Sequence, residues 1–337
     1  MNVTLIGIDL AKSVFQVCAV NQQGKVVFNR QVRRNRLMAL LMNYPEAVIA
    51  MEACSGSNYW GRALEQQGFT VRLIPPQHVK PFIKGNKNDR NDAFAITEAA
   101  RRPHLRCVRP RTLAQTDLIQ VHRVLDRQVR QRTALINQIR GFLGEYGVVV
   151  ARGKERLWHA LPDVLEEVDN GLTPSARELV AELRQEWAIL QQAIRRLEQQ
   201  IKTQSRVDEA ARRLMQIKGV GERISTAAVA YAGNGQGYRN GRHFAANLGL
   251  VPKERSSGGK QQLGGMTKRG NRYLRRLLIQ GAWTVVRYAS RGQDRLSRWA
   301  VKLIERRGKH KAVVAVANKM ARIIWSMLYH RTEYRPI

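Results

Sequence analysis

Short apolar runs and helical segments follow one another in a defined order over residues 3–101. Runs typical of buried strands lie at 3–9, 13–20, 26–32, 47–52 and 70–76. Helical spacing occurs at 36–44 and 59–68, and a further helix starts near Asn91. The element order is therefore strand, strand, strand, helix, strand, helix, strand, helix, which predicts an α/β domain built on one mixed sheet.

This order is that of the ribonuclease-H-like fold, in which the first three strands are antiparallel and the later strands run parallel to the first. Asp9 then ends the first strand and Glu52 ends the fourth. Because these two strands are expected to be parallel neighbours, both carboxylates are predicted at the same carboxyl edge of the sheet. Ligands of open α/β sheets bind at that edge.

Two further acids follow in "NKNDRNDAF", where Asp89 and Asp92 are three residues apart and share a helix face near its N-terminus. Four carboxylates at one place would repel one another unless a cation neutralised them, and hard oxygen ligands suit Mg²⁺ or Mn²⁺. A metal there would stabilise the charge of a phosphoryl transfer. Taken singly, Asp9 could cap a helix or form an ion pair, Glu52 could cap a turn, and the helix dipole alone could favour the other two.

The charge of the chain is strongly positive. It contains 58 Lys and Arg against 26 Asp and Glu, a formal charge of +32, spread over several segments. Such a charge favours a polyanionic partner, and nucleic acid is the default expectation. A membrane surface is the weaker alternative because no segment resembles an amphipathic anchor.

The three cysteines, at positions 18, 54 and 107, are too few and too scattered for a disulfide framework or a zinc site. No signal peptide opens the sequence, and no apolar run is long enough to span a bilayer. We therefore expect a soluble, cytoplasmic protein.

The middle of the chain is predicted to be helical. Residues 112–146 form one long helix, with Arg123, Arg127 and Arg130 outside its apolar stripe. A second helix is predicted to start in "GLTPSARE", with Ser175 as its cap. It continues into a heptad seam formed by Leu183, Trp187, Leu190, Ile194, Leu197 and Ile201. This seam predicts either an amphipathic helix packed within its own chain or a coiled coil, antiparallel or between subunits.

The last third of the chain contains two features that suit nucleic acid. The segment 214–233 is a helix, a tight turn with Gly219 and Gly221, and a second helix, as in a helix-hairpin-helix that holds a DNA phosphate. A loop with adjacent Ser256 and Ser257 and a basic helix follow. The cations expected to contact phosphates there are Lys260, Lys268, Arg269, Arg272, Arg275 and Arg276. The alternative is a solvated helix face.

Several motifs resemble those of the DEDD-type insertion-sequence transposases, which are related to the Piv DNA invertase and are described as bridge-RNA-guided recombinases. They are "IGIDLAK", "AMEACSGSNYW", "NKNDRNDAFAI", "IKGVGERISTAAVAYAG" and "AANLGLVPKERSSGGK…GGMTKRGNRYLRRLLIQGA". The resemblance covers nearly the whole chain. It implies a RuvC-like domain at 1–110, linking helices with a coiled coil at 111–205, and a carboxy-terminal transposase domain at 206–337.

The resemblance also implies site residues. Mg²⁺ would bind Asp9, Glu52, Asp89 and Asp92, and a serine after "GLVP" would be the nucleophile, by position Ser257 rather than Ser256. A serine needs a base or a metal to activate it. The sequence places no histidine beside it except His243, on the preceding helix, so activation by metal is the better hypothesis.

The resulting expectation is a transposase, or site-specific recombinase, that cuts and rejoins DNA through a serine–phosphate link. The family implies that a structured bridge RNA pairs with target and donor duplexes, and that the protein is a homo-oligomer, a dimer or tetramer, acting at the bacterial nucleoid. One alternative is a metal-dependent nuclease of the Holliday-junction-resolvase kind, which uses water instead of serine. Another is a non-catalytic nucleic-acid-binding protein, which four clustered acids disfavour.

Overall fold

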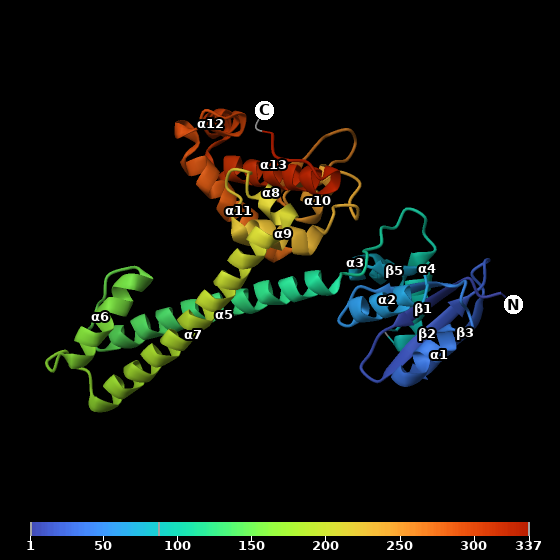
Figure 1. The fold of residues 1–337 in the computed structure, drawn as a ribbon, viewed down its shortest axis with the longest axis horizontal. Coiled ribbons are helices and arrows are strands. Elements are labelled where there is room, and N and C mark those ends of the chain that lie inside the picture. Colours follow the sequence, from blue (N-terminus) through green and yellow to red (C-terminus); the bar gives the residue numbers. More distant parts are fainter. Residues whose placement is uncertain (1, 87, 336–337) are drawn as a thin grey trace. The chain divides into compact units, whose positions relative to one another are not determined.

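The computed structural model describes residues 2–86 and 88–335 (Figure 1). The chain divides into two compact units, residues 1–113 and 114–337. Within the described residues, no helix combines the length and the apolar character needed to cross a membrane.

The amino-terminal unit is built on one five-stranded sheet. Its strands are β1 (Leu5–Asp9), β2 (Val14–Val20), β3 (Val26–Arg33), β4 (Val48–Glu52) and β5 (Val71–Ile74). The spatial order is β3-β2-β1-β4-β5, with β1, β2 and β3 antiparallel and β4 and β5 parallel to β1. The predicted element order and strand directions are confirmed, and the sheet is consistent with a ribonuclease-H-like domain.

Helices cover both faces of this sheet. The helices of the unit are η1 (Arg34–Arg36), α1 (Leu37–Leu41), α2 (Ser57–Gln66), α3 (Pro76–Val79), η2 (Lys80–Phe82) and α4 (Asp89–Ala100). Ile6 and Ile8 of β1 pack with α1 and α2 in one apolar cluster, whereas Leu5 packs with α4 in another. Successive strand residues point to opposite faces, so both faces of β1 are buried and its sequence is apolar throughout.

Helix α4 crosses β1 closely. A Cβ placed on Gly7 would lie 2.6 Å from Cγ2 of Thr97, so glycine is needed for this approach. At the other end of α4, Arg101 donates a hydrogen bond of 2.9 Å to the carbonyl of Gln23, in the turn that joins β2 to β3. That turn lies beside the start of β1. The helix therefore runs antiparallel to β1, and its first turn lies at the carboxyl edge of that strand.

Three helices open the second unit: α5 (Leu113–Glu145), α6 (Lys154–Glu166) and α7 (Pro174–Val207). The long helix predicted at 112–146 is confirmed. The predicted cap of α7 is wrong: the hydroxyl of Thr173, not Ser175, accepts the Ala176 N–H at 3.1 Å. Pro174 then occupies the first helical position, where its fixed φ suits the helix and its missing N–H costs nothing.

The heptad seam of α7 packs against α5 of the same chain. Ile194 and Ile201 form a buried cluster with Leu125, and Arg132 donates a hydrogen bond of 2.8 Å to the side chain of Gln191. Trp187 packs nearer the other end of α5, so the two helices run antiparallel. The seam is thus buried within the chain, as the first of its predicted alternatives has it, and it needs no second subunit to cover it.

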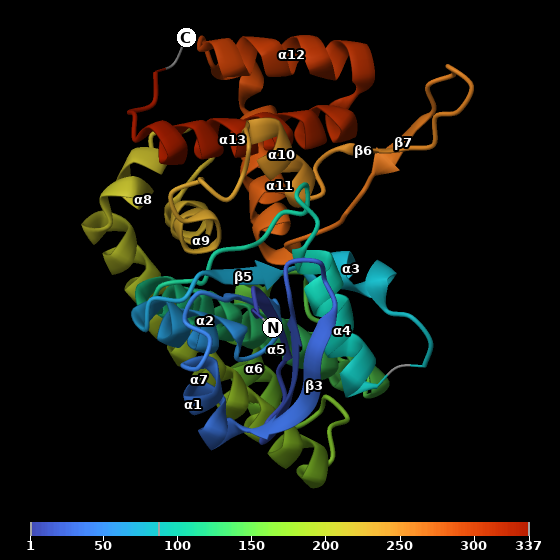
Figure 2. The same ribbon diagram turned by 90° about the vertical axis from the view of Figure 1, so that its right-hand side faces the viewer.

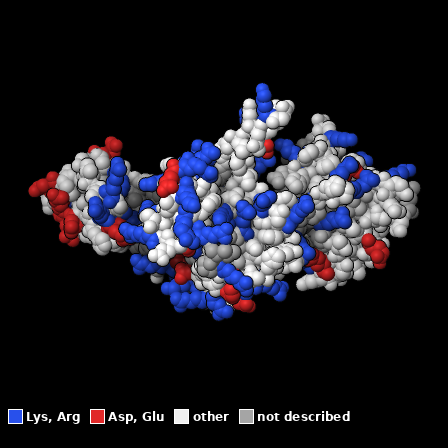
Figure 3. All heavy atoms as spheres, turned by 90° about the horizontal axis from the view of Figure 1, so that it is seen from above, with Lys and Arg blue, Asp and Glu red and all other residues white. Residues whose placement is uncertain are grey.

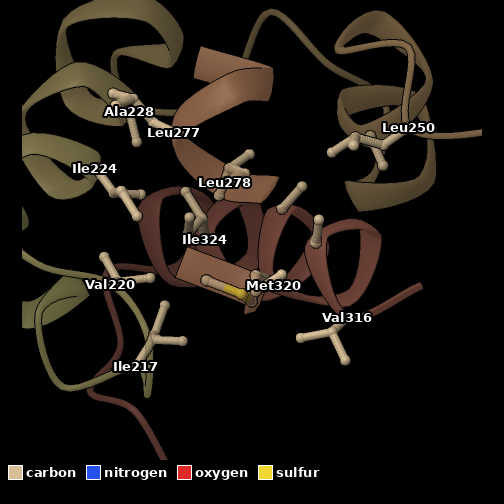
Figure 4. Close-up of a cluster of buried hydrophobic side chains, with 14 of the residues drawn as sticks. Ile217, Val220, Ile224, Ala228, Leu250, Leu277, Leu278, Val316, Met320 and Ile324 are labelled. Atoms are coloured by element: carbon tan, nitrogen blue, oxygen red, sulfur yellow. The ribbon is translucent and has the colours of Figure 1, made fainter. Parts of the chain in front are cut away.

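The remaining elements are helices that pack around α13, whose buried side chains Figure 4 shows in close-up, and a hairpin of two short strands. They are α8 (Glu209–Leu214), α9 (Glu222–Ala232), α10 (Gly241–Asn247), β6 (Pro252–Glu254), β7 (Leu263–Met266), α11 (Arg272–Arg287), η3 (Ala289–Arg291), α12 (Arg295–Arg307) and α13 (Lys309–His330). Met320 and Ile324 of α13 are fully buried against Leu278 of α11 and the turn before α9.

A buried histidine connects helices α5, α9 and α11. His122 of α5 is 3% exposed, and its ring nitrogens are 2.9 Å from the Tyr273 hydroxyl and 3.1 Å from the Thr226 hydroxyl. Burial, and then the charge of Arg223, lowers the pKa of His122 to about 4 from 6.5. The ring is therefore neutral at pH 7, and the polar contacts satisfy it.

This predicts a loss of stability in mild acid. The unfolded chain takes up a proton below pH 6.5 whereas the native ring does so only near pH 4, so stability falls by up to about 3 kcal/mol across that window. Urea unfolding at pH 7.5 and pH 4.5 measures it. His122→Gln should be less stable at neutral pH and lose this share of the pH dependence, whereas the exposed His243→Gln should retain it. Equal pH dependence in the wild type and His122→Gln would contradict the argument.

Candidate active site and nucleic-acid interface

Asp9 and Glu52 lie side by side at the carboxyl edge of the sheet. Ile8 is paired with Met51 in the parallel register of β1 and β4, and the two acids come next on their strands. Both are half-buried. Burial raises the pKa of the Cys54 thiol, and the carboxylates of Glu52 and Asp9 raise it further, so both negative charges act on one neighbourhood.

Both acids lie on the face of the sheet that α4 covers. Gly7 and Ala50 face α4, as the close approach at Gly7 and the shared apolar cluster show. Asp9 and Glu52 are each two residues further along their strands, and residues two apart share a face. The first turn of α4 lies at the same edge, so the fold brings this turn toward the two strand ends.

The first turn of α4 carries Asp89 and Asp92. Asn88 caps the helix by accepting the Asn91 N–H at 2.8 Å. Asp89 is exposed, whereas Asp92 is half-buried and its Oδ1 is buried with no hydrogen-bond partner among the described residues. The helix N-terminus favours negative charge at both positions.

An orphaned buried carboxylate oxygen is costly, and such an oxygen suits a cation. The donor set of carboxylates at this edge is the kind that Mg²⁺ and Mn²⁺ prefer. Across residues 2–86 and 88–335, however, no three His, Cys, Asp or Glu side chains come together as a complete metal-binding group. The observed chemistry fits a metal, and the four-acid site stays a prediction.

The two serines lie on a β-hairpin, residues 252–266, which we name the serine hairpin (Figure 2). Gly258 and Gly259 both have positive φ, 55° and 74°, as a two-residue type I′ turn requires. The N–H of Lys260 donates to the carbonyl of Ser257 at 3.0 Å and closes this turn. Ser257 is therefore the last residue before the tip.

The two serine hydroxyls have different surroundings. The Ser256 hydroxyl donates to the Glu254 carboxylate at 2.7 Å and accepts the Gln262 N–H at 3.2 Å, so it braces the two arms of the hairpin. Ser257 is exposed, and its hydroxyl makes no hydrogen bond to another described residue. Of the two, Ser257 is the one available to react. The family motif had favoured Ser257 by position, but the sequence shows no difference in the surroundings of the two hydroxyls.

One predicted phosphate contact needs correction. Arg275 is 8% exposed, and its guanidinium donates to the carbonyls of Leu248 at 2.9 Å and Arg269 at 2.6 Å. Burial lowers its pKa, and the nearby charge of Arg272 adds to this effect. A buried charge must be satisfied by such bonds, so Arg275 fastens the chain on either side of the serine hairpin to α11 and is left out of the interface.

Most of the other predicted cations are exposed. Arg276 pairs with Asp126 of α5 and lies over the ring of Tyr273, and Arg130 pairs with the same carboxylate at 3.4 Å. The remaining predicted contacts are exposed and have no ion-pair partner among the described residues: Arg123, Arg127, Lys260, Lys268, Arg269 and Arg272. Figure 3 shows that Lys and Arg outnumber acids on the face drawn there.

The glycine turn between α8 and α9 has two separable roles. Gly219 has a φ of 83°, and a Cβ there would lie 2.6 Å from the carbonyl oxygen of Gly281, so it is required for close packing against α11. Gly221 is exposed with open space around it and precedes the N-terminus of α9. This packing role was not visible in the spacing of the two glycines.

Both glycines line a cavity of about 650 Å³. Its other walls include the cations Arg195, Lys202 and Arg223 and the acids Glu198 and Glu222, of which Arg223 and Glu198 are paired. The N-terminus of α9 and the cations Arg195 and Lys202 favour a phosphate here, whereas Glu222 in the first turn of α9 opposes one.

Comparison with known proteins gives a consistent result. Residues 6–148 match the sequence model of the IS110 DEDD type, described as transposase, and residues 211–297 match the model of the transposase IS116/IS110/IS902 family. A probable family 20 transposase of Pseudomonas aeruginosa is 45% identical over the full length of both chains. The transposase for insertion sequence element IS1111A of Coxiella burnetii is 41% identical, over 99% of this chain and 92% of its own. The transposase for insertion sequence element IS1328 of Yersinia enterocolitica is 38% identical, over 99% of each chain.

Proposed function

Because this chain belongs to the IS116/IS110/IS902 family of transposases, it is the transposase of an insertion sequence, and we propose that it cuts and rejoins DNA through a covalent bond between Ser257 and a phosphate. The observation that supports this most is the exposed Ser257 hydroxyl at the tip of the serine hairpin, beside a Ser256 hydroxyl that is bonded to Glu254 and Gln262. The expected site of action is DNA in the bacterial cytoplasm.

The proposed reaction is a transesterification. The Ser257 oxygen bonds to phosphorus and its proton passes to an acceptor. The bond from phosphorus to one sugar oxygen breaks, and that oxygen takes up a proton, which leaves a free hydroxyl on that DNA end. The reverse attack by a DNA hydroxyl restores the phosphodiester and the serine. Since one phosphate ester replaces another, rejoining needs no external energy source.

Asp9, Glu52, Asp89 and Asp92 are the proposed ligands of a divalent cation, Mg²⁺ or Mn²⁺. A cation held there would stabilise the charge that develops on the phosphate. Asp92 is the best supported ligand because its buried Oδ1 has no donor among the described residues. The resolvase-like nuclease uses the same acids with water, and a covalent protein–DNA adduct separates the two functions. Loss of all cleavage without a divalent metal separates either from a simple binder.

DNA binding is expected to depend steeply on salt. Every phosphate that a Lys or Arg neutralises releases counterions, with a slope near −0.9 in log K against log salt for duplex DNA. Replacing either Arg127 or Arg272 by Gln should reduce the magnitude of the salt slope by about one and weaken binding to all DNA sequences alike. Lys154→Gln is the control, because this lysine is already paired with Glu155 on α6. An affinity that hardly changes from low to physiological salt would contradict a phosphate-dominated interface.

The second proposed partner is a structured guide RNA that pairs with target and donor DNA. It is supported by the family resemblance and by the positive charge. We expect one discrete RNA to co-purify with the full-length protein expressed together with its flanking element sequence. Sequencing of the bound RNA is the measurement. Recovery of only heterogeneous cellular fragments, with recombination unaffected by ribonuclease, would contradict this partner.

We also propose a homo-oligomer, a dimer or tetramer, because strand exchange between two duplexes needs more than one active site. The seam of α7 is packed against α5, so the subunits are expected to meet through other surfaces.

A further inference from the structure

A second cavity, of about 1000 Å³, lies at the base of the serine hairpin. The hairpin contributes Pro252 and residues 264–266, α12 contributes Trp299, and α13 contributes the opposite wall. Sites for small ligands typically occupy roughly 300–1,000 Å³, so this cavity has room for a nucleotide. Neither the acid site nor the Ser257 hydroxyl accounts for it.

The interior of the cavity suits a flat apolar ring. Met266, Val314 and Ile323 line it together with Trp299, and the hairpin wall carries two glycines in succession. A Cβ on Gly265 would meet no atom within 4 Å, so the absence of a side chain there is not explained by packing inside the protein. It leaves a bare backbone against which a ring can lie.

The cavity is also lined by cations without any acid. Lys311, Lys319 and Arg322 line it, no Asp or Glu does, and none of these three has an ion-pair partner among the described residues. The ammonium of Lys319 lies 4.5 Å from the centre of the Trp299 ring. Burial lowers the pKa of Lys319, and the charges of Arg295 and Arg322 lower it further. Uncompensated cations at an apolar cavity favour an anionic ligand that carries an apolar group.

We infer that this cavity holds one unpaired nucleotide of the DNA strand that Ser257 attacks, with its base against Trp299 and Met266 and its phosphate on Lys319 and Arg322. A nucleotide combines a stacking ring with a phosphate, and proteins bind unpaired strands with aromatic and basic groups together. Ser257 is five residues beyond Pro252, about 16 Å along the hairpin. That length corresponds to about five base steps of 3.4 Å, so the bound nucleotide lies about five steps along the strand from the attacked phosphate.

This inference rests on the proposed function but is tested by binding alone. All measurements use the full-length Ser257→Ala protein, which forms no adduct, so their failure leaves the serine proposal standing. The probes are a labelled oligothymidine and a duplex of the same length. The double variant Lys319→Gln/Arg322→Gln should lose about tenfold in affinity for the single strand and about threefold or less for the duplex. The control, Arg306→Gln/Arg307→Gln, removes the same charge from exposed positions of α12 outside the cavity and should affect both probes alike.

The aromatic contact gives an independent readout. Trp299→Leu should weaken oligothymidine binding with little change for the duplex, and Trp299→Phe should restore most of it. Photocrosslinking of a bromodeoxyuridine oligonucleotide should label the peptide that contains Trp299 or Met266. Equal losses for single strand and duplex in the cavity variants, or a crosslink elsewhere only, would overturn the inference. A larger loss for oligouridine than for oligothymidine would assign the cavity to RNA and overturn the DNA occupant.

Discussion

Ser257→Ala will bind DNA as the wild type does and yet form no covalent adduct and no recombinant product. The substitution removes one exposed hydroxyl that makes no hydrogen bond to the described residues, so it costs little stability. It also removes the atom that the proposed ester needs. Loss of a nucleophile of this kind lowers the rate by at least about a thousandfold.

Ser256→Ala is the matched control, one residue away. It breaks the bonds to Glu254 and to the Gln262 N–H, worth about 1 kcal/mol each, so it should loosen the serine hairpin and lower the rate only modestly. Mass spectrometry of the trapped adduct, trimmed with nuclease, locates the modified residue. A nucleotide on Ser256 would reverse the assignment within the hairpin. Wild-type cleavage by Ser257→Ala, with no adduct on any serine, would leave the resolvase-like nuclease as the better function.

The second large effect is expected at the acids. Asp9→Asn, Glu52→Gln, Asp89→Asn and Asp92→Asn each keep the size of the side chain and remove one negative charge. If these acids hold a divalent cation, each change removes stabilisation that mainly the transition state needs, and strand cleavage is lost while the fold remains. The largest effect on metal binding is expected at Asp92, whose buried Oδ1 has no donor among the described residues.

Metal binding can be measured apart from activity. A cation that binds only the native state raises the unfolding temperature with its concentration, so Mg²⁺ or Mn²⁺ should stabilise the wild type and not Asp92→Asn. Glu98→Gln is the control on the same helix, because Glu98 pairs with Arg101 and Arg102 at the other end of α4. It should keep both cleavage and the metal response. Normal cleavage by two or more of the four acid variants would contradict the assignment of these acids as metal ligands.

Local patterns predicted the elements of the amino-terminal sheet. Apolar runs predict the five strands, and helical segments precede β4 and β5. The strand directions followed from matching this order of elements to the ribonuclease-H-like fold. The positions of Asp9 and Glu52 then depend only on where β1 and β4 end, which the sequence also marks. The long helices were predicted for the same reason, because a period of 3.6 residues is a local property.

The tertiary structure determined the roles of those residues whose partners lie far away in the sequence. Nothing in the sequence around Arg275 distinguishes it from an exposed basic residue. Its structural role comes from its hydrogen bonds to the carbonyls of Leu248 and Arg269. The need for glycine at position 219 follows from the close approach of Gly281, and the apolar seam of α7 follows from its packing against α5. The difference between Ser256 and Ser257 arises because the strand pairing of the hairpin brings Gln262 to one hydroxyl and leaves the other at the tip. Periodicity fixes which face a residue takes on its own element, whereas burial and hydrogen bonding are set by segments far away in the chain, and no local pattern records which segments those are.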